Sequence, residues 1–276
     1  GFTAAKPVPT APGEFKPWEN IMRIQQTLAA AALVLAGNPV PANNLVPALP
    51  LGLPSVVAVG TELPTRTPPV NLGGSGFAVG DGLYIVTNAH VIPPLLDIAN
   101  QERIGVMIAQ GAVKKFRYAK IAQVDTTHDI ALLRLEGEPL PTVQLGDSDT
   151  LVEGQALAMT GYPIGMALQQ MVTHRGMVSS IGPIVLPALR GQQLDVKMVR
   201  RLREPFNIIQ LDATAYPGNS GSPLYDPQTG KVLGIIDAVF VKATKESALT
   251  APSGITYAIP ANFIRELLNQ NKLTQP

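Results

Sequence analysis

Short runs of β-branched and other apolar residues, each interrupted by glycine or proline, most restrict how this chain can fold. The 25 glycines and 26 prolines leave few stretches long enough for a helix, and both residue types favour turns. About ten to twelve short strands therefore indicate an all-β fold made of two small barrels. The runs with strand character are 55–59, 76–79, 84–87, 105–108, 120–124, 131–135, 156–161, 171–179, 208–211, 232–240 and 255–259.

The two ends of the chain differ from this central part. Residues 1–53 combine a proline-rich arm with an amphipathic helix expected over 18–36. The apolar residues 28–36 behind Arg23 also resemble a secretory leader, and this alternative stays open. We expect the folded domain over 54–276, with barrels over about 54–150 and 151–260 followed by a C-terminal helix.

Composition excludes several classes of function. With 46% hydrophobic residues the chain can bury a sizeable core, whereas a net charge of +1 is too small to hold nucleic acid. The absence of cysteine excludes disulfides, thiolate catalysis and thiolate metal sites. No stretch reaches the roughly 18 apolar residues of a membrane span. We find no histidine ligand cluster or phosphate-binding glycine loop, so we expect neither a metal nor a cofactor.

Three polar residues are candidates for nucleophilic catalysis. His90 ends an apolar strand, Asp129 directly precedes the buried strand 130–135, and Ser220 lies in the turn Gly-Asn-Ser-Gly. Serine is a weak nucleophile that needs a base, which imidazole supplies, and a carboxylate that orients the imidazole. Each segment alone is a weak signal, but together they supply one group of each kind.

The order of these segments resembles the chymotrypsin-like serine proteases, and within them the HtrA/DegP family. The resemblance rests on Thr-Asn-Ala-His, His-Asp-Ile-Ala-Leu-Leu and Gly-Asn-Ser-Gly-Ser-Pro-Leu, and it extends over about residues 54–271. It implies a double six-stranded antiparallel β-barrel and a serine endopeptidase of unfolded or misfolded proteins that acts through an acyl-enzyme. His90 would be the general base, Asp129 its orienting group and Ser220 the nucleophile. The amides of Gly218 and Ser220 would form the oxyanion hole.

The resemblance also implies a primary specificity pocket lined by Thr214, Ala215, Ala238 and Val239. None of these residues is charged, so we expect cleavage after small or medium aliphatic residues. Asp237 leaves two possibilities open. A slip of one residue would point it into the pocket and select arginine or lysine. In the preferred register it approaches Asp129, where two close carboxylates raise one pKa.

Regulation and the remaining polar segments give further expectations. Asn219 replaces the aspartate with which digestive relatives capture a new amino terminus, so we expect control by rearrangement of surface loops. The basic segment 182–205 is either a partner-binding sensor loop or a solvated insertion. His128 and His174 are expected to be structural, bonded to backbone or neighbouring carboxylates.

Alternatives to an HtrA-type enzyme remain. One alternative is a catalytically silent protease-fold scaffold that binds proteins or peptides. The other is a glutamyl-endopeptidase-like secreted protease, whose motif Gly-Asn-Ser-Gly-Ser-Pro includes the serine found here at Ser222. The acid-recognising histidine of the latter is absent from 235–239. An α/β-hydrolase is excluded because its histidine follows the serine.

The resemblance finally implies polypeptide substrates, an extracytoplasmic location and a homo-oligomer formed through the N-terminal segment. Relatives often carry a PDZ module after the protease domain, whereas we expect none within these 276 residues.

Overall fold

The computed structural model describes residue 1 and residues 53–110, 113–163, 170–183, 205–238 and 254–273. All described elements lie in the compact unit Asn44–Pro276. The expected N-terminal arm and helix, most of the basic segment 182–205 and Val239 lie outside the described residues. No helix in the described ranges combines the length and apolar character needed to cross a bilayer.

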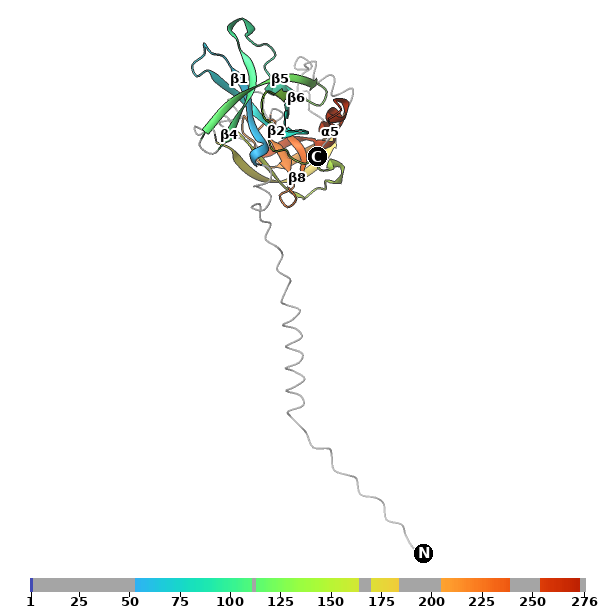
Figure 1. The fold of residues 1–276 in the computed structure, drawn as a ribbon. Coiled ribbons are helices and arrows are strands. Elements are labelled where there is room, and N and C mark those ends of the chain that lie inside the picture. The colour runs from blue at the N-terminus through green and yellow to red at the C-terminus, as the bar shows by residue number, and fades with distance from the viewer. Residues whose placement is uncertain (2–52, 111–112, 164–169, 184–204, 239–253, 274–276) are drawn as a thin grey trace, which may run out of the picture. The chain divides into compact units, whose positions relative to one another are not determined.

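The first half of this unit is a closed barrel of six antiparallel strands (Figure 1). Neighbouring strands follow the order β1-β2-β3-β6-β5-β4. The strands are β1 (Val56–Glu62), β2 (Val70–Val79), β3 (Tyr84–Asn88), β4 (Arg103–Gln110), β5 (Val113–Asp125) and β6 (Ile130–Leu135).

The second half repeats this architecture in the order β10-β11-β12-β9-β8-β7. The helix α5 (Ala261–Gln270) follows the last strand. The predicted double six-stranded β-barrel with a C-terminal helix is therefore confirmed. The strands are β7 (Ala156–Gly161), β8 (Val172–Pro183), β9 (Asn207–Asp212), β10 (Pro223–Tyr225), β11 (Val232–Asp237) and β12 (Ile255–Pro260).

Several strands are apolar on both faces because the two barrels pack against each other. In β3, Ile85 belongs to the interior of the first barrel, whereas Val86 belongs to a cluster shared with the second barrel and α5. In β11, Ile236 faces the interior of the second barrel and Ile235 joins that shared cluster. Alternate residues of one strand thus fill two different cores, which explains the near-continuous apolar runs in the sequence.

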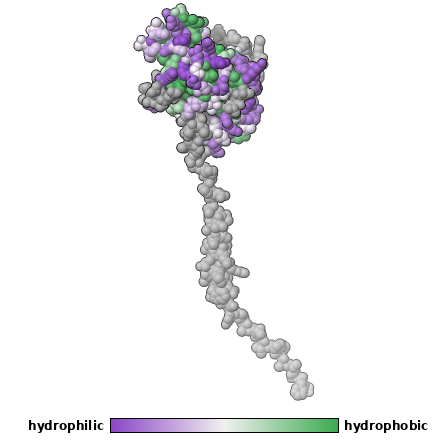
Figure 2. Space-filling model, in the orientation of Figure 1, coloured by the Kyte–Doolittle hydropathy of each residue, from purple (hydrophilic) through white to green (hydrophobic). Residues whose placement is uncertain are grey.

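Helix α5 closes the shared cluster. Ile264, Leu267 and Leu268 are buried at helical spacing, as the amphipathic pattern predicts. On the face visible in Figure 2, hydrophilic residues predominate over the described part and hydrophobic residues are interspersed among them. The apolar material that positions the polar groups described below is therefore mainly internal.

Candidate active site

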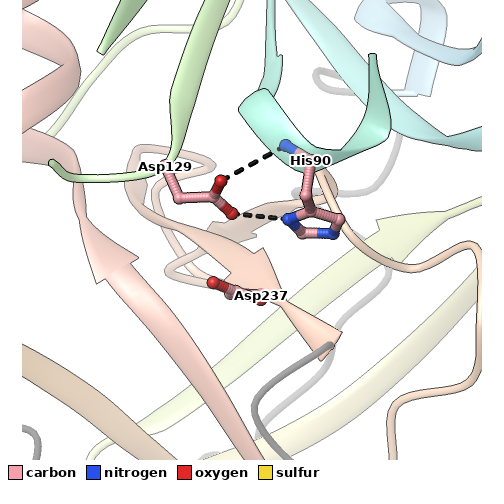
Figure 3. A group of neighbouring side chains, drawn as sticks. All are labelled: His90, Asp129 and Asp237. Atoms are coloured by element: carbon pink, nitrogen blue, oxygen red, sulfur yellow. Dashed lines mark hydrogen bonds and ion pairs between the residues drawn. The ribbon is translucent and has the colours of Figure 1, made fainter. Parts of the chain in front are cut away.

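His90 and Asp129 meet at one end of the first barrel. His90 lies in the short 3-10 helix η2 (Ala89–Val91), which continues β3, and Asp129 lies just before β6. His90 Nδ1 is 2.5 Å from Asp129 Oδ2, and the backbone amide of His90 donates to Asp129 Oδ1 at 3.2 Å (Figure 3). The carboxylate thus holds both the ring and the backbone of His90, which fixes the orientation of the imidazole.

The backbone on both sides supports this contact. Asn88 Nδ2 and the amide of Ala89 both donate to the carbonyl of Asp129, at 3.1 and 3.0 Å. Asp129 itself has a left-handed φ of 57°, a conformation that aspartate tolerates better than most residues. Its side chain is only 1% exposed. The tight turn therefore delivers a buried carboxylate to the end of β3.

Ser220 lies in a loop of the second barrel whose shape depends on glycine. Gly218 and Gly221 have φ of 100° and 88°, and a Cβ atom on Gly221 would lie 1.9 Å from the carbonyl oxygen of Ser75. Gly74 packs between the two halves of the site. An added Cβ there would lie 2.6 Å from Val91 Cγ2 and 2.8 Å from the carbonyl oxygen of Ser220. The backbone at Gly74 therefore lies close both to the Ser220 loop and to Val91, the residue after His90.

The hydroxyl of Ser220 and the imidazole of His90 are not joined by a hydrogen bond in this structure. The amide of Ala238 donates to Ser220 Oγ at 3.3 Å. His90 Nε2 is buried and has no hydrogen-bond partner among the described residues. The structure therefore brings His90 to Asp129 and leaves Nε2 available as a proton acceptor. The amides of Gly218 and Ser220 likewise donate to no protein acceptor within the described segments.

Ser75 is a residue of the site to which the sequence analysis assigned no role. Its hydroxyl donates to the carbonyl of Gly218 at 2.7 Å and accepts from the amide of Tyr162 at 2.8 Å. Its own amide donates to the carbonyl of Ser220 at 2.7 Å. Ser75 therefore joins β2 of the first barrel to the Ser220 loop and to the end of β7. The only local signal was a serine between two glycines, Gly74 and Gly76.

The predicted pocket residues are in part outside the described ranges. Thr214 and Ala215 are half-buried in the segment before Ser220, and Ala238 is half-buried directly after β11. Ala215 and Ala238 pack against the core of the second barrel. Of these residues, Ala238 contacts Ser220, because its amide donates to Ser220 Oγ.

Asp237 is the last residue of β11 and is 2% exposed. Ligand atoms of His90, Asp129 and Asp237 all lie within 4.8 Å of one another (Figure 3). The register with Asp237 beside Asp129, rather than in the specificity pocket, is therefore the one adopted. One imidazole and two carboxylates are a set of ligands that suits a divalent cation. However, His90 Nδ1 is already bonded to Asp129, so we interpret the group as a hydrogen-bonded cluster.

The two other histidines lie apart from this cluster. His128 Nδ1 is 2.6 Å from Asp125 Oδ2, and its ring stacks on Phe263 of α5 with centroids 3.9 Å apart. Burial raises the pKa of Asp125, but hydrogen bonds from the side chain and backbone of His128 outweigh it, so the pKa is lowered overall. His128 therefore has the expected structural role.

His174 departs from the expectation of a hydrogen-bonded histidine. Its Nε2 is buried without a hydrogen-bond partner among the described residues, and its ring lies 5.8 Å from that of Tyr216. Burial lowers the pKa of His174 because a charged imidazolium would be poorly solvated there. A neutral ring against an aromatic neighbour explains why no carboxylate partner is needed.

Comparisons with known proteins identify the family of this chain. Residues 74–235 match the family model of the trypsin-like peptidase domain. A periplasmic DegP-like serine endoprotease of Halomonas elongata is 34% identical over 71% of this chain and 34% of its own length. The serine protease Do-like HtrA of Lactobacillus helveticus is 32% identical over 70% of this chain and 41% of its own length. The chain thus spans about a third to two fifths of these relatives.

Solved structures show the same fold. The HtrA-type protease AlgW with a tripeptide is 27% identical, with a TM-score of 0.59, over 82% of this chain and 62% of that one. The Rv3671c protease of M. tuberculosis in its active form is 22% identical, with a TM-score of 0.59, over 87% of this chain and 89% of that one.

Proposed function

This chain belongs to the trypsin-like peptidase family, and from that membership we propose that it is an HtrA-type serine endopeptidase of unfolded or misfolded polypeptides. One observation supports this most strongly. His90 is held by Asp129 through its Nδ1, at 2.5 Å, while its Nε2 has no partner among the described residues. This is the arrangement that a general base beside a serine nucleophile requires.

In the proposed reaction Ser220 Oγ attacks the scissile carbonyl carbon and passes its proton to His90 Nε2. The negative charge of Asp129 stabilises the imidazolium that forms. The amides of Gly218 and Ser220 donate to the oxyanion, and each such donor contributes about 3 to 4 kcal/mol. The intermediate collapses when His90 returns the proton to the leaving amine, which gives an acyl-enzyme. Water then attacks this ester by the same route, and Ser220 regains its proton.

The first step requires the hydroxyl of Ser220 to change its orientation. In the resting structure Oγ accepts from the amide of Ala238 at 3.3 Å. That distance is long for a hydrogen bond, so a rotation about the Cα–Cβ bond that turns Oγ towards Nε2 costs little. Catalytic hydrogen bonds often tighten only when substrate is bound.

We extend the proposal to specificity and setting. Thr214, Ala215, Ala238 and Val239 would form an uncharged pocket that accepts small or medium aliphatic side chains before the cleaved bond. Relatives named as periplasmic endoproteases support an extracytoplasmic location. A homo-oligomer formed through residues 1–53 remains part of the same proposal.

A catalytically silent scaffold is the second candidate, favoured by the bond of Ser220 Oγ to Ala238 rather than to His90. Digestion of unfolded casein by the wild type, Ser220→Ala and Ser222→Ala separates the two. Ser222 is a matched control because it is 1% exposed and its Oγ has no partner among the described residues.

We expect the wild type and Ser222→Ala to cut casein and Ser220→Ala to leave it intact. Mass-spectrometric mapping of the fragments then reads the preferred side chain before each cut. Casein left intact by all three proteins, with the wild type folded, would favour the scaffold.

A further inference from the structure

Asp237 gives the cluster a second buried carboxylate that the proposed reaction does not use. It ends β11 of the second barrel, whereas His90 and Asp129 belong to the first. Both carboxylates are almost completely withdrawn from water, with exposed fractions of 1% for Asp129 and 2% for Asp237. Figure 3 shows the three side chains converging from three separate segments.

The position of Asp237 is set by the fold rather than by a flexible loop. In the β11–β12 ladder Asp237 is the register partner of Tyr257, and Ile235 is that of Ile259. Ile235 is fully buried in the shared cluster, two residues before Asp237 on the same face of the strand. The packing of Ile235 therefore keeps the carboxylate of Asp237 directed at His90 and Asp129.

The carboxylates of Asp129 and Asp237 have oxygen atoms within 4.8 Å of each other. If both were ionised in this buried site they would repel each other strongly, because little water screens them. The titratable groups around Asp237 include His90 from η2, Asp129 before β6 and Tyr257 from β12. On β3, which packs on β11, the buried polar residues Thr87 and Asn88 are uncharged. Retention of one proton by the pair removes the repulsion without moving either strand.

We propose that Asp129 and Asp237 share one proton in the resting protein, and that Asp237 is a positioning residue that sets the charge facing His90. The inference rests on the proposed function. Attack by Ser220 moves its proton to His90 Nε2, and the imidazolium then faces a pair with one negative charge. At higher pH the pair gives its shared proton to solvent. The imidazolium then faces two negative charges, which stabilise it further.

The kinetic test compares the rate of Ser220 labelling by a fluorophosphonate at several pH values in the wild type and in Asp237→Asn. We expect the wild type to show one more rise with pH than Asp237→Asn, because only the wild type loses the shared proton. The alkaline plateau of Asp237→Asn is at least about tenfold lower, because one charge near 5 Å is lost. Asp212→Asn, a change at an exposed residue of β9, is the control and should match the wild type.

The second test counts protons and does not depend on activity. At pH 6 both carboxylates are ionised in the unfolded chain, so unfolding of the wild type releases one proton more than unfolding of Asp237→Asn. The pH dependence of denaturant unfolding measures this difference. If Asp237→Asn does not fold, infrared spectroscopy of the wild type at pH 7 shows whether a carboxyl group is protonated. A protonated carboxyl band is expected, and its absence would overturn the proposal.

The outcomes separate the two proposals. Equal proton release and the same number of kinetic rises in both proteins would refute the shared proton, while normal Ser220 labelling would leave the endopeptidase in place. Absence of labelling from every folded variant would refute the endopeptidase, and proton release would still decide whether the carboxylates share a proton.

Discussion

Replacement of Ser75 by alanine tests whether one hydroxyl holds the Ser220 loop against the first barrel. The change removes the donor to the carbonyl of Gly218 and the acceptor for the amide of Tyr162, at 2.7 and 2.8 Å. Both backbone groups would remain buried, and each unmet group costs about 1 to 3 kcal/mol. We therefore expect Ser75→Ala to lower the free energy of unfolding by about 2 to 6 kcal/mol.

The measurement is urea unfolding followed by circular dichroism, with the labelling rate of Ser220 determined under native conditions. The labelling rate should also fall, because the peptide after Gly218 loses its anchor next to the proposed oxyanion hole. Ser222→Ala is the matched control: both serines are nearly inaccessible, but Ser222 Oγ has no partner among the described residues. Equal stability of the two variants would refute the role assigned to Ser75.

Two further substitutions test the local geometry. Gly221→Ala places a Cβ atom 1.9 Å from the carbonyl oxygen of Ser75, at a residue with a φ of 88°. We therefore expect the variant to lose more than about 2 kcal/mol of unfolding free energy and to label more slowly at Ser220. A Gly221→Ala variant as stable to heat as the wild type would contradict this expected strain. Asp125→Asn removes a carboxyl whose pKa is lowered in the folded state, chiefly by His128. The contribution of the Asp125 carboxylate to stability is present above its unfolded pKa of about 4, and it is lost as the pH falls through its folded pKa. Asp125→Asn should therefore lose less stability than the wild type on acidification. Urea unfolding of both proteins from pH 6 to 2 measures this difference.

Much of the fold was predictable because its strands are apolar over most of their length. The runs at 84–87 and 131–135 coincide with β3 and β6 to within one residue at each end. Strand β10 was not predicted, since it has three residues and begins at Pro223. It exists because β7 and β11 pair with it from either side, which is information that a local pattern does not contain.

The candidate site was predictable to a different degree at each residue. His90, Asp129 and Ser220 stand in recognisable local patterns, and their catalytic roles stay predictions. Ser75 lies 143 residues from Gly218 in sequence, so no spacing rule indicates their hydrogen bond. The direction of Asp237 depends on strand register, and a shift of one residue reverses the face of a strand. The pairing of Asp237 with Tyr257 supplied that missing information.

The central claim is that Ser220 is a nucleophile activated by His90 and Asp129. The most direct measurement is mass-spectrometric mapping of the residue modified by a fluorophosphonate in the wild type, His90→Ala and Asp129→Asn. We predict modification of Ser220 in the wild type, none detectable in His90→Ala, and a rate lower by about four orders of magnitude in Asp129→Asn. Equal modification of Ser220 in all three folded proteins, or modification of another residue instead, would contradict the account.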